Sequence, residues 1–439
     1  MLDWSLISGA VPVWAVVIGA LSLVALAVGS GSRWWTRLVP SILLGAIVLA
    51  VVVKVVVELW QPFPDALPWT VLVCIGVAGL GIELAVVRPP ITGRFGPRRR
   101  WWHRVGVVGA ALVVVAASAA EVNRYYGQYP TLRNALGLSY SNQIAFGQLP
   151  PSADQEAAPR PGQPLSEIWR PPPGMPAGGM ISPAPIPAPV SGFAARPGWV
   201  YLPPAYLASP RARLPVLVLL GGQPGTTRDW LDGGRLTEFM DRFASAHNGL
   251  APVVVMPDHL GATTANPLCL DSRLGKVETY LSVDVPTWIR AHLHINTDAR
   301  AWAIAGFSQG GTCALQLAVR APGIYPTFVD ISGQDEPTLG NRKRTVDAAF
   351  GGDRAAFAKV NPLDLLATSR YSASAGSIVV GRDDRTYRPQ QQHVFAACRG
   401  AGMDVSWLEL PGGHTWPVWA PGLERSLPWL GVRLGLTAA

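Results

Sequence analysis

Four long apolar runs within the first 120 residues constrain this chain more than any other feature of its sequence. Val, Ala, Leu and Ile dominate these runs, which cover approximately residues 11–30, 39–60, 68–87 and 105–120. A helix needs about 20 residues, at about 1.5 Å each, to cross about 30 Å of hydrocarbon. The first three runs reach that length alone, and the fourth reaches it with its flanks. The sequence therefore predicts a bundle of four transmembrane helices over residues 1–125.

The positions of the arginines predict how these helices are oriented. Eight arginines lie in the loops after the first and third runs: Arg33, Arg37, Arg88, Arg94, Arg98, Arg99, Arg100 and Arg104. The N-terminus and the loop after the second run offer only Asp3 and Asp65. Because basic loops stay in the cytoplasm, we expect a multi-pass protein of the plasma membrane. Both termini, and everything after residue 121, are then expected outside the cell.

The formal net charge of +8 does not indicate nucleic-acid binding. The eight arginines of those two loops equal the whole excess of positive charge, and three of them adjoin Trp101 and Trp102. Basic residues and tryptophans beside an apolar run are typical of contact with anionic lipid headgroups. The expected partner is therefore the lipid bilayer, and no nucleic acid.

A proline-rich segment separates the apolar runs from the rest of the chain. Thirteen of the forty residues from Pro150 to Pro189 are prolines. Such a composition excludes regular helices and inner strands and favours an extended, semi-rigid chain. We expect an extracytoplasmic linker over residues 126–177, followed by edge structure and a strand that ends at Pro203.

Residues 178–439 read as a second domain in which strands alternate with helices. Strands are expected near 214–220, 252–256, 301–305, 377–380 and 404–410, and helices near 234–247, 280–292 and 309–320. Strands that are separated by helices of this length form mostly parallel sheets. The expected fold class is a four-helix transmembrane bundle followed by an α/β domain.

A glycine-flanked serine stands where one of these strands meets a helix. The sequence Gly306-Phe307-Ser308-Gln309-Gly310 follows the strand at 301–305 and opens the helix at 309–320. In that context GxSxG is the sharp turn that exposes a nucleophilic serine above the sheet of an α/β-hydrolase. We therefore expect Ser308 to be the nucleophile.

An α/β-hydrolase also needs an acid and then a histidine after the serine in the chain. His414 follows the last strand, whereas the other histidines precede the serine or belong to helices or to the cytoplasmic loop. The acid should follow the preceding strand, where Asp383 and Asp384 stand together. Asp384 is the first choice and Asp383 the reserve, with Asp335 and Asp364 weaker candidates.

The oxyanion hole should combine two backbone N–H groups. One is expected from Gln309, and the other from the loop Gly221–Gly225 after the first buried strand. Gln223 is the preferred donor there and Gly222 the second choice, because Pro224 has no N–H.

Three of these segments together resemble a known family. They are Ser191–Phe193 with Val200–Tyr206, Gly306–Gly311, and Gly412–Trp416. With them the segment from about 178 to 435 resembles the putative-esterase family of α/β-hydrolases, which includes esterase D, feruloyl esterases and the antigen 85 mycolyltransferases. Four-span proteins with such an outer domain resemble those of high-GC Gram-positive bacteria.

The resemblance implies ester cleavage or acyl transfer through an acyl-serine, with no metal and no cofactor. The expected substrate is an ester of a lipid or cell-envelope component, such as an aminoacylated phospholipid or a mycolate-like ester. The alternative is a non-catalytic envelope-binding or transport-accessory protein on a hydrolase scaffold. Exported domains permit disulfides, so Cys269 and Cys313 are either bonded to each other or two partly buried thiols.

Overall fold

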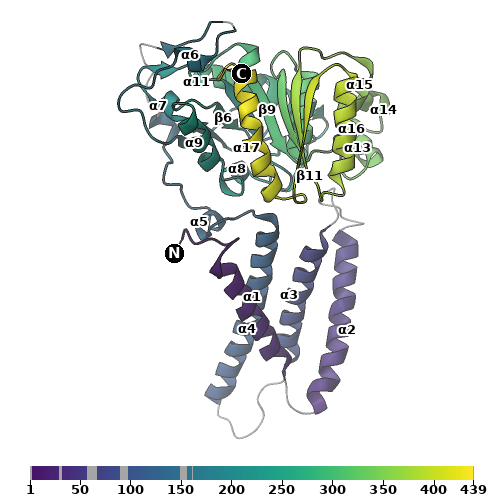
Figure 1. Cartoon of the computed structure of the whole chain (residues 1–439). Helices are drawn as coiled ribbons and strands as arrows, with labels where there is room; N and C mark the ends of the chain where they lie inside the picture. The colour runs from purple at the N-terminus through teal and green to yellow at the C-terminus, as the bar shows by residue number, and fades with distance from the viewer. Residues whose placement is uncertain are drawn as a thin grey trace. The chain divides into compact units, whose positions relative to one another are not determined.

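The computed structural model describes residues 2–28, 32–56, 67–88, 97–148, 156–160 and 162–438. The chain divides into two compact units, Met1–Leu138 and Ser139–Ala439 (Figure 1). Asp65, Arg94 and residues 149–155 of the expected linker lie outside the described ranges.

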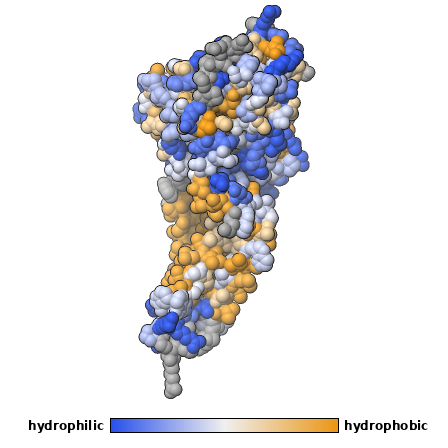
Figure 2. Space-filling view, turned by 90° about the vertical axis from the view of Figure 1, so that its left-hand side faces the viewer, coloured by the Kyte–Doolittle hydropathy of each residue, from blue (hydrophilic) through white to orange (hydrophobic). Residues whose placement is uncertain are grey.

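Four long helices make up most of the N-terminal unit: α1 (Ala10–Ala27), α2 (Ser32–Lys54), α3 (Trp69–Val87) and α4 (Pro97–Tyr126). Each contains a stretch long and apolar enough to cross a membrane, and at most 17% of each apolar stretch is buried inside the protein. Figure 2 shows the resulting hydrophobic surface along these helices. Helices with so much exposed apolar surface are typical of membrane spans, so the predicted four-helix bundle is confirmed.

Small residues allow these helices to approach one another closely. A Cβ atom added to Gly19 of α1 would lie 2.5 Å from the Cβ atom of Ala117 on α4. A Cβ added to Gly81 of α3 would lie 2.8 Å from the side chain of Val114, also on α4. Close backbone approach at small residues is the usual way in which membrane helices gain packing contacts.

The helices reach further into the expected basic loops than the apolar runs indicated. Arg33 lies in the first turn of α2, and Arg98 to Arg100 lie in the first turn of α4. With 30 residues α4 is about 45 Å long, which matches the bilayer with its headgroup regions. Arg88 follows α3 and donates to the backbone oxygens of Ala25 (2.6 Å) and Leu26 (2.7 Å), so it satisfies carbonyls at the end of α1.

An eight-stranded sheet forms the centre of the C-terminal unit (Figure 1), in the spatial order β12-β11-β10-β9-β5-β6-β3-β2. The strands are β2 (Met180–Ala184), β3 (Gly198–Leu202), β5 (Val216–Leu220), β6 (Val253–Met256), β9 (Trp302–Phe307), β10 (Thr327–Ile331), β11 (Ala375–Gly381) and β12 (Asp404–Leu410). Neighbours from β6 to β12 run parallel, whereas β2 and β3 join antiparallel at one edge. The predicted α/β-hydrolase fold is confirmed.

Helices cover this sheet in two groups. In one group α9 (Leu236–Ala246) packs against α17 (Trp416–Arg433), and in the other α12 (Gln309–Arg320), α15 (Pro362–Thr368) and α16 (Tyr387–Gly400) pack side by side. A further helix, α11 (Val285–His292), continues from a π-helical turn at Tyr280–Asp284. All residues of β3, β5, β6, β9, β10 and β11 are buried, because both faces of the sheet are covered.

Short elements complete the two units. They are α5 (Leu132–Ala135) in the first, and β1 (Glu156–Ala157), α6 (Leu165–Ile168), α7 (Pro204–Leu207), β4 (Arg211–Ala212), α8 (Asp229–Asp232), β7 (Asp271–Ser272), β8 (Gly275–Lys276), α10 (Val277–Thr279), α13 (Arg342–Phe350) and α14 (Arg354–Ala358) in the second.

Two features of the C-terminal unit could not be read from the sequence. The compact unit begins at Ser139, and described residues of the proline-rich segment pack in its core. Leu165 and Trp169 lie in its core with 1% and 2% exposure, and the Trp169 Nε1–H donates to the Asn248 carbonyl at 2.8 Å. In addition, β10 was not expected, although it is a central strand between β9 and β11.

Candidate active site

Ser308 stands at a strained turn between β9 and α12. Its φ of 53° and ψ of −125° lie in a region that non-glycine residues rarely adopt. The turn is possible because its flanking glycines bring backbone segments into contact. A Cβ on Gly306 would lie 2.3 Å from the Gly310 oxygen, and a Cβ on Gly310 would lie 2.1 Å from the Gly221 oxygen. The structure thus places Ser308 at the tight elbow that the motif predicted.

A hydrogen-bonded relay joins the serine to a histidine and an acid. The His414 Nε2 lies 2.9 Å from Ser308 Oγ, and the His414 Nδ1 lies 2.9 Å from Asp384 Oδ2. Asp384 follows β11 and His414 follows β12, so the two side chains meet at the carboxyl edge of the parallel sheet. Ser308 and Asp384 are each only 4% exposed. The structure therefore brings together the three residues that the chain order selected.

The reserve acid lies outside this relay. Asp383 is exposed, and its Oδ2 accepts a hydrogen bond from the Gly412 N–H at 3.2 Å. The weaker candidates have other partners, since Asp335 lies 3.3 Å from His393 and Asp364 lies 2.8 Å from Arg342. Of the four candidate acids, Asp384 is the one that contacts His414.

Two aromatic rings fix the imidazole of His414 from different sides. Tyr387 stacks on it with ring centroids 4.2 Å apart, and Trp419 meets it edge-on at 4.9 Å. The Tyr387 N–H also donates to Asp384 Oδ1 at 2.9 Å. The Tyr387 hydroxyl accepts from the Gln334 Nε2 at 3.3 Å. Sequence reasoning missed this tyrosine, because the contacts depend on how α16 packs against the loop after β12.

The two segments expected to form an oxyanion hole lie against the nucleophile elbow. Gln309 is the first residue of α12, where a backbone N–H has no partner within the helix. The loop after β5 touches the residue before Ser308, since a Cβ on Gly222 would lie 2.5 Å from the Phe307 ring. Gln223 in that loop is 7% exposed, and its side chain donates to the Thr264 carbonyl at 2.9 Å. The loop and the first turn of α12 are therefore neighbours.

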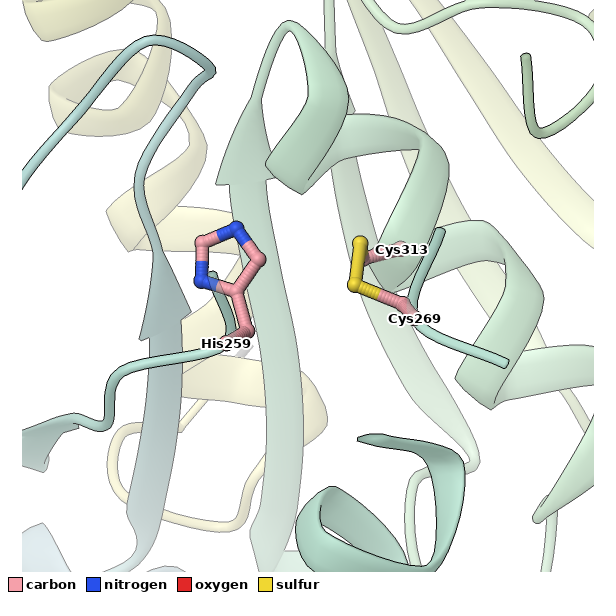
Figure 3. Close-up of side chains that lie close together, drawn as sticks. All are labelled: His259, Cys269 and Cys313. Carbon is pink, nitrogen blue, oxygen red and sulfur yellow. A yellow bond between two sulfur atoms is a disulfide. The ribbon is translucent and has the colours of Figure 1, made fainter. Parts of the chain in front are cut away.

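A second buried cluster contacts Gln309. Figure 3 shows its members, His259, Cys269 and Cys313. His259 is 3% exposed and contacts Gln309 Oε1 through its Nε2 at 2.8 Å. Cys269 and Cys313 form a disulfide, which decides between the two alternatives that the sequence left open. Sequence reasoning set His259 aside because it precedes the serine.

The protonation of His259 follows from its surroundings. Burial lowers the pKa of the imidazole. Asp258, Gln309 and the backbone of Gly221 raise it, but the effect of burial is larger. The ring is therefore neutral near pH 7. His259, Cys269 and Cys313 place their donor atoms within 4.8 Å of one another. However, sulfurs that are bonded to each other are not thiolates, the form that binds metals, so the cluster does not fit a metal ion in this state.

Comparisons with known proteins identify the family of the C-terminal unit. Residues 195–430 match the family model described as Putative esterase. A relative from Corynebacterium glutamicum, described as an uncharacterized protein, is 34% identical over 434 residues, which cover 96% of this chain and 95% of the relative. The acetyl esterase of Caldicellulosiruptor saccharolyticus is 23% identical over 235 residues, 49% of this chain and 83% of that enzyme.

A solved structure shows the same fold. A ferulic acid esterase superposes with a TM-score of 0.50 and 20% identity, covering 58% of this chain and 98% of its own. The family model covers more than half of the chain and includes the elbow, the acid and the histidine. The resemblance found in the sequence is thereby confirmed, and the chain belongs to the Putative esterase family, with a hydrolase domain joined to four candidate membrane helices.

Proposed function

We propose that this protein is a membrane-anchored, extracytoplasmic serine esterase or acyltransferase. Its substrate is an ester of a lipid or cell-envelope component, and the reaction proceeds through an acyl-serine. The observation that carries this proposal is the relay Ser308–His414–Asp384, with both hydrogen bonds at 2.9 Å.

Each residue of the relay has a distinct role in the proposed reaction. Ser308 Oγ attacks the acyl carbonyl while His414 Nε2 takes the hydroxyl proton. Asp384, which accepts from the His414 Nδ1–H, holds the tautomer and stabilises the imidazolium that forms. His414 then returns the proton to the departing alcohol, and the acyl group stays on Ser308. His414 then activates an acceptor that attacks the acyl-serine and takes the acyl group from Ser308. When the acceptor is water the reaction is hydrolysis, and when it is a hydroxyl group of another molecule the reaction is acyl transfer.

The tetrahedral intermediate carries a negative charge that needs donors. We assign this role to the backbone N–H of Gln309 and to one from the loop after β5, with Gln223 preferred and Gly222 second. The positive end of the α12 dipole adds to this stabilisation. Removing one such donor from a serine hydrolase typically lowers kcat about 10²- to 10³-fold.

The arrangement of charges in the N-terminal unit supports an extracytoplasmic location. The basic residues flank the ends of α1, α2, α3 and α4 that adjoin the first and third loops, and such residues remain cytoplasmic. The Cys269–Cys313 disulfide agrees, since disulfides persist in oxidising compartments. A catalytic domain anchored to the membrane meets lipid-soluble and envelope esters directly, which favours them as substrates.

A fluorophosphonate probe tests the proposed chemistry on the full-length protein in detergent. Such probes phosphonylate serines that a neighbouring base activates, so we expect labelling of the wild type and none of Ser308→Ala. Hydrolysis of a short p-nitrophenyl ester should disappear in the same variant. A wild-type protein that is folded but neither labelled nor active would instead support the non-catalytic scaffold.

A further inference from the structure

His259, Gln309 and the Cys269–Cys313 disulfide form a buried group that the relay does not use. The Gln309 side chain is 6% exposed, and Cys269 and Cys313 are 0% and 1% exposed. Figure 3 shows the imidazole of His259 next to the Cys269–Cys313 disulfide, and their donor atoms lie within 4.8 Å of one another. Burying a polar side chain costs free energy unless it finds hydrogen-bond partners, so the partners of His259 indicate what it does at this position.

The imidazole of His259 is bonded to one segment of the proposed oxyanion hole and lies beside the other. Its Nε2 lies 2.8 Å from Gln309 Oε1, a contact that requires the tautomer with hydrogen on Nε2. The backbone of Gly221, at the start of the loop after β5, raises the pKa of the same imidazole, and Gly221 and His259 line one small cavity. Since His259 itself follows β6, it connects the loop after β5 to the first residue of α12 from a third, separate segment.

The disulfide holds the other end of the Gln309 side chain. The Gln309 Nε2 donates to Cys269 Sγ at 3.5 Å. Cys269 is fixed to α12 twice, by its bond to Cys313 and by the Gln316 Nε2, which donates to the Cys269 carbonyl at 2.6 Å. The side-chain amide of Gln309 is therefore held between the imidazole of His259 and the sulfur of Cys269, which is itself bonded to α12.

The spacing of the two segments decides how well an oxyanion hole works. Its donors must lie about 2.7–3.1 Å from the position of the oxyanion, and they act because they are fixed before the reaction. One donor sits on Gln309 and the other on the loop that begins at Gly221. A residue that is bonded to Gln309 and lies beside Gly221 limits the distance between the two donors.

We propose that His259 is a positioning residue for the oxyanion hole. It holds the Gly221 loop and the Gln309 peptide at the separation that a tetrahedral intermediate needs. This inference rests on the proposed function, because it assumes that Ser308 forms such an intermediate. It assigns His259 no contact with the substrate.

Three variants of the full-length protein test this role. His259→Ala removes the bond to Gln309 and the side chain beside Gly221, whereas in His259→Gln the side-chain amide replaces the Nε2–H donor to Gln309. His247→Ala is the matched control, because His247 is a half-buried histidine directly after α9 whose Nδ1 contacts the Phe243 carbonyl. Active sites are counted by end-point fluorophosphonate labelling, and kcat and KM for a p-nitrophenyl ester are expressed per labelled site.

We expect His259→Ala to lower kcat on the order of tenfold to a hundredfold, somewhat less than the loss of an oxyanion donor itself. KM should change less than about threefold, because the hole acts on the transition state. The affinity for a boronic acid, which forms a tetrahedral adduct with the serine, should fall as much as kcat/KM. His259→Gln should recover most of the loss, and His247→Ala should match the wild type.

Two results separate this inference from the proposed function. If the wild type is not labelled at all, the proposed function fails and the positioning role fails with it. If His259→Ala is labelled but keeps kcat within about twofold, only the positioning role is overturned. If His259→Ala does not fold, the test is made on His259→Gln. A lowered kcat in that variant with an unchanged affinity for the boronic acid also overturns the positioning role.

Discussion

The phenol ring of Tyr387 stacks on the imidazole of His414, with ring centroids 4.2 Å apart and an interplanar angle of 26°. The same tyrosine donates its backbone N–H to Asp384 Oδ1 at 2.9 Å, and Asp384 Oδ2 contacts the His414 Nδ1. Tyr387 thus orients both members of the acid–histidine pair. Its hydroxyl connects to Thr312 of α12 through Gln334, which contacts both residues.

The stack predicts that the ring of Tyr387 matters more than its hydroxyl. Tyr387→Phe keeps the ring and should lower kcat/KM only a few-fold, whereas Tyr387→Leu frees the imidazole to rotate. Aromatic pairs of this kind contribute about 0.5–1.5 kcal/mol, so Tyr387→Leu should lower kcat/KM up to about tenfold. Steady-state kinetics on a p-nitrophenyl ester measures both. Equal losses in the two variants would assign the effect to the hydroxyl.

The relay predicts a large difference between two adjacent aspartates. Asp384→Asn should lower kcat about 10⁴-fold, the loss known when a serine-protease acid is changed in this way, because the amide favours the wrong tautomer of His414. Asp383→Asn is the matched control, since Asp383 is exposed and an asparagine still accepts from the Gly412 N–H. The reverse pattern would transfer the role to Asp383 and leave the rest of the mechanism unchanged.

The disulfide predicts a stability that depends on reducing agents. Cys269 and Cys313 are 44 residues apart, and closing a loop of that size is worth about 2–4 kcal/mol. Dithiothreitol should therefore lower the urea midpoint of the wild type but not that of a variant with serine at both positions. Cys398→Ala, which changes a buried free thiol, should keep the response to dithiothreitol. A wild-type midpoint that the reductant does not move would contradict the bond.

The candidate site could be proposed from the sequence, whereas one central strand of the sheet could not be predicted. The order Ser308, Asp384, His414 follows from chain topology, because the carboxyl ends of parallel strands meet at one edge of the sheet. β10 was missed because it is five residues long and carries Asp330 inside an otherwise apolar run. Length and hydropathy alone do not distinguish such a strand from a loop.

Contacts between distant segments account for the other differences. Proline content predicts an extended chain before residue 178, but it shows neither the helical turn at Leu165–Ile168 nor whether that chain packs on a domain. Trp169 lies in the core although its segment is rich in proline. Nothing in the sequence around His259 indicates its bond to Gln309, which is 50 positions away and reaches it only through the fold.

Asp330 is a buried carboxylate that the proposed reaction does not use. It is 0% exposed, and it accepts from the Gly333 N–H and from the Gln391 Nε2, both at 3.0 Å. Burial raises its pKa from 3.8 to about 7, although these two hydrogen bonds lower it. Between pH values of about 4 and 7, Asp330 is protonated in the folded protein and ionised in the unfolded chain. Its contribution to the stability of the folded protein therefore falls as the pH rises through this range.

Asp330→Asn should therefore stabilise the protein relative to the wild type more at pH 8 than at pH 5. The amide still accepts from the Gly333 N–H, and it carries no charge at either pH. Urea midpoints followed by tryptophan fluorescence measure the difference between variant and wild type at each pH, so the contributions of other acids cancel. The same difference at both values would show that Asp330 does not titrate in this range.

The distribution of arginines predicts that both termini and the hydrolase domain lie outside the cytoplasm. The basic residues Arg33 and Arg98 to Arg100 stand in the first turns of α2 and α4, at the ends that the first and third loops join. Positive charges at those ends resist translocation. A reporter that is active only in the cytoplasm should work when fused after residue 37, and one that is active only after export should work after residue 130.

Replacing Arg98, Arg99 and Arg100 together by Ala should weaken this preference for an outward-facing C-terminal domain. Replacing Arg124 and Arg133, which lie at the opposite end of α4 and beyond it, should not. Both fusions on the same side of the membrane would overturn the four-span, outward-facing arrangement.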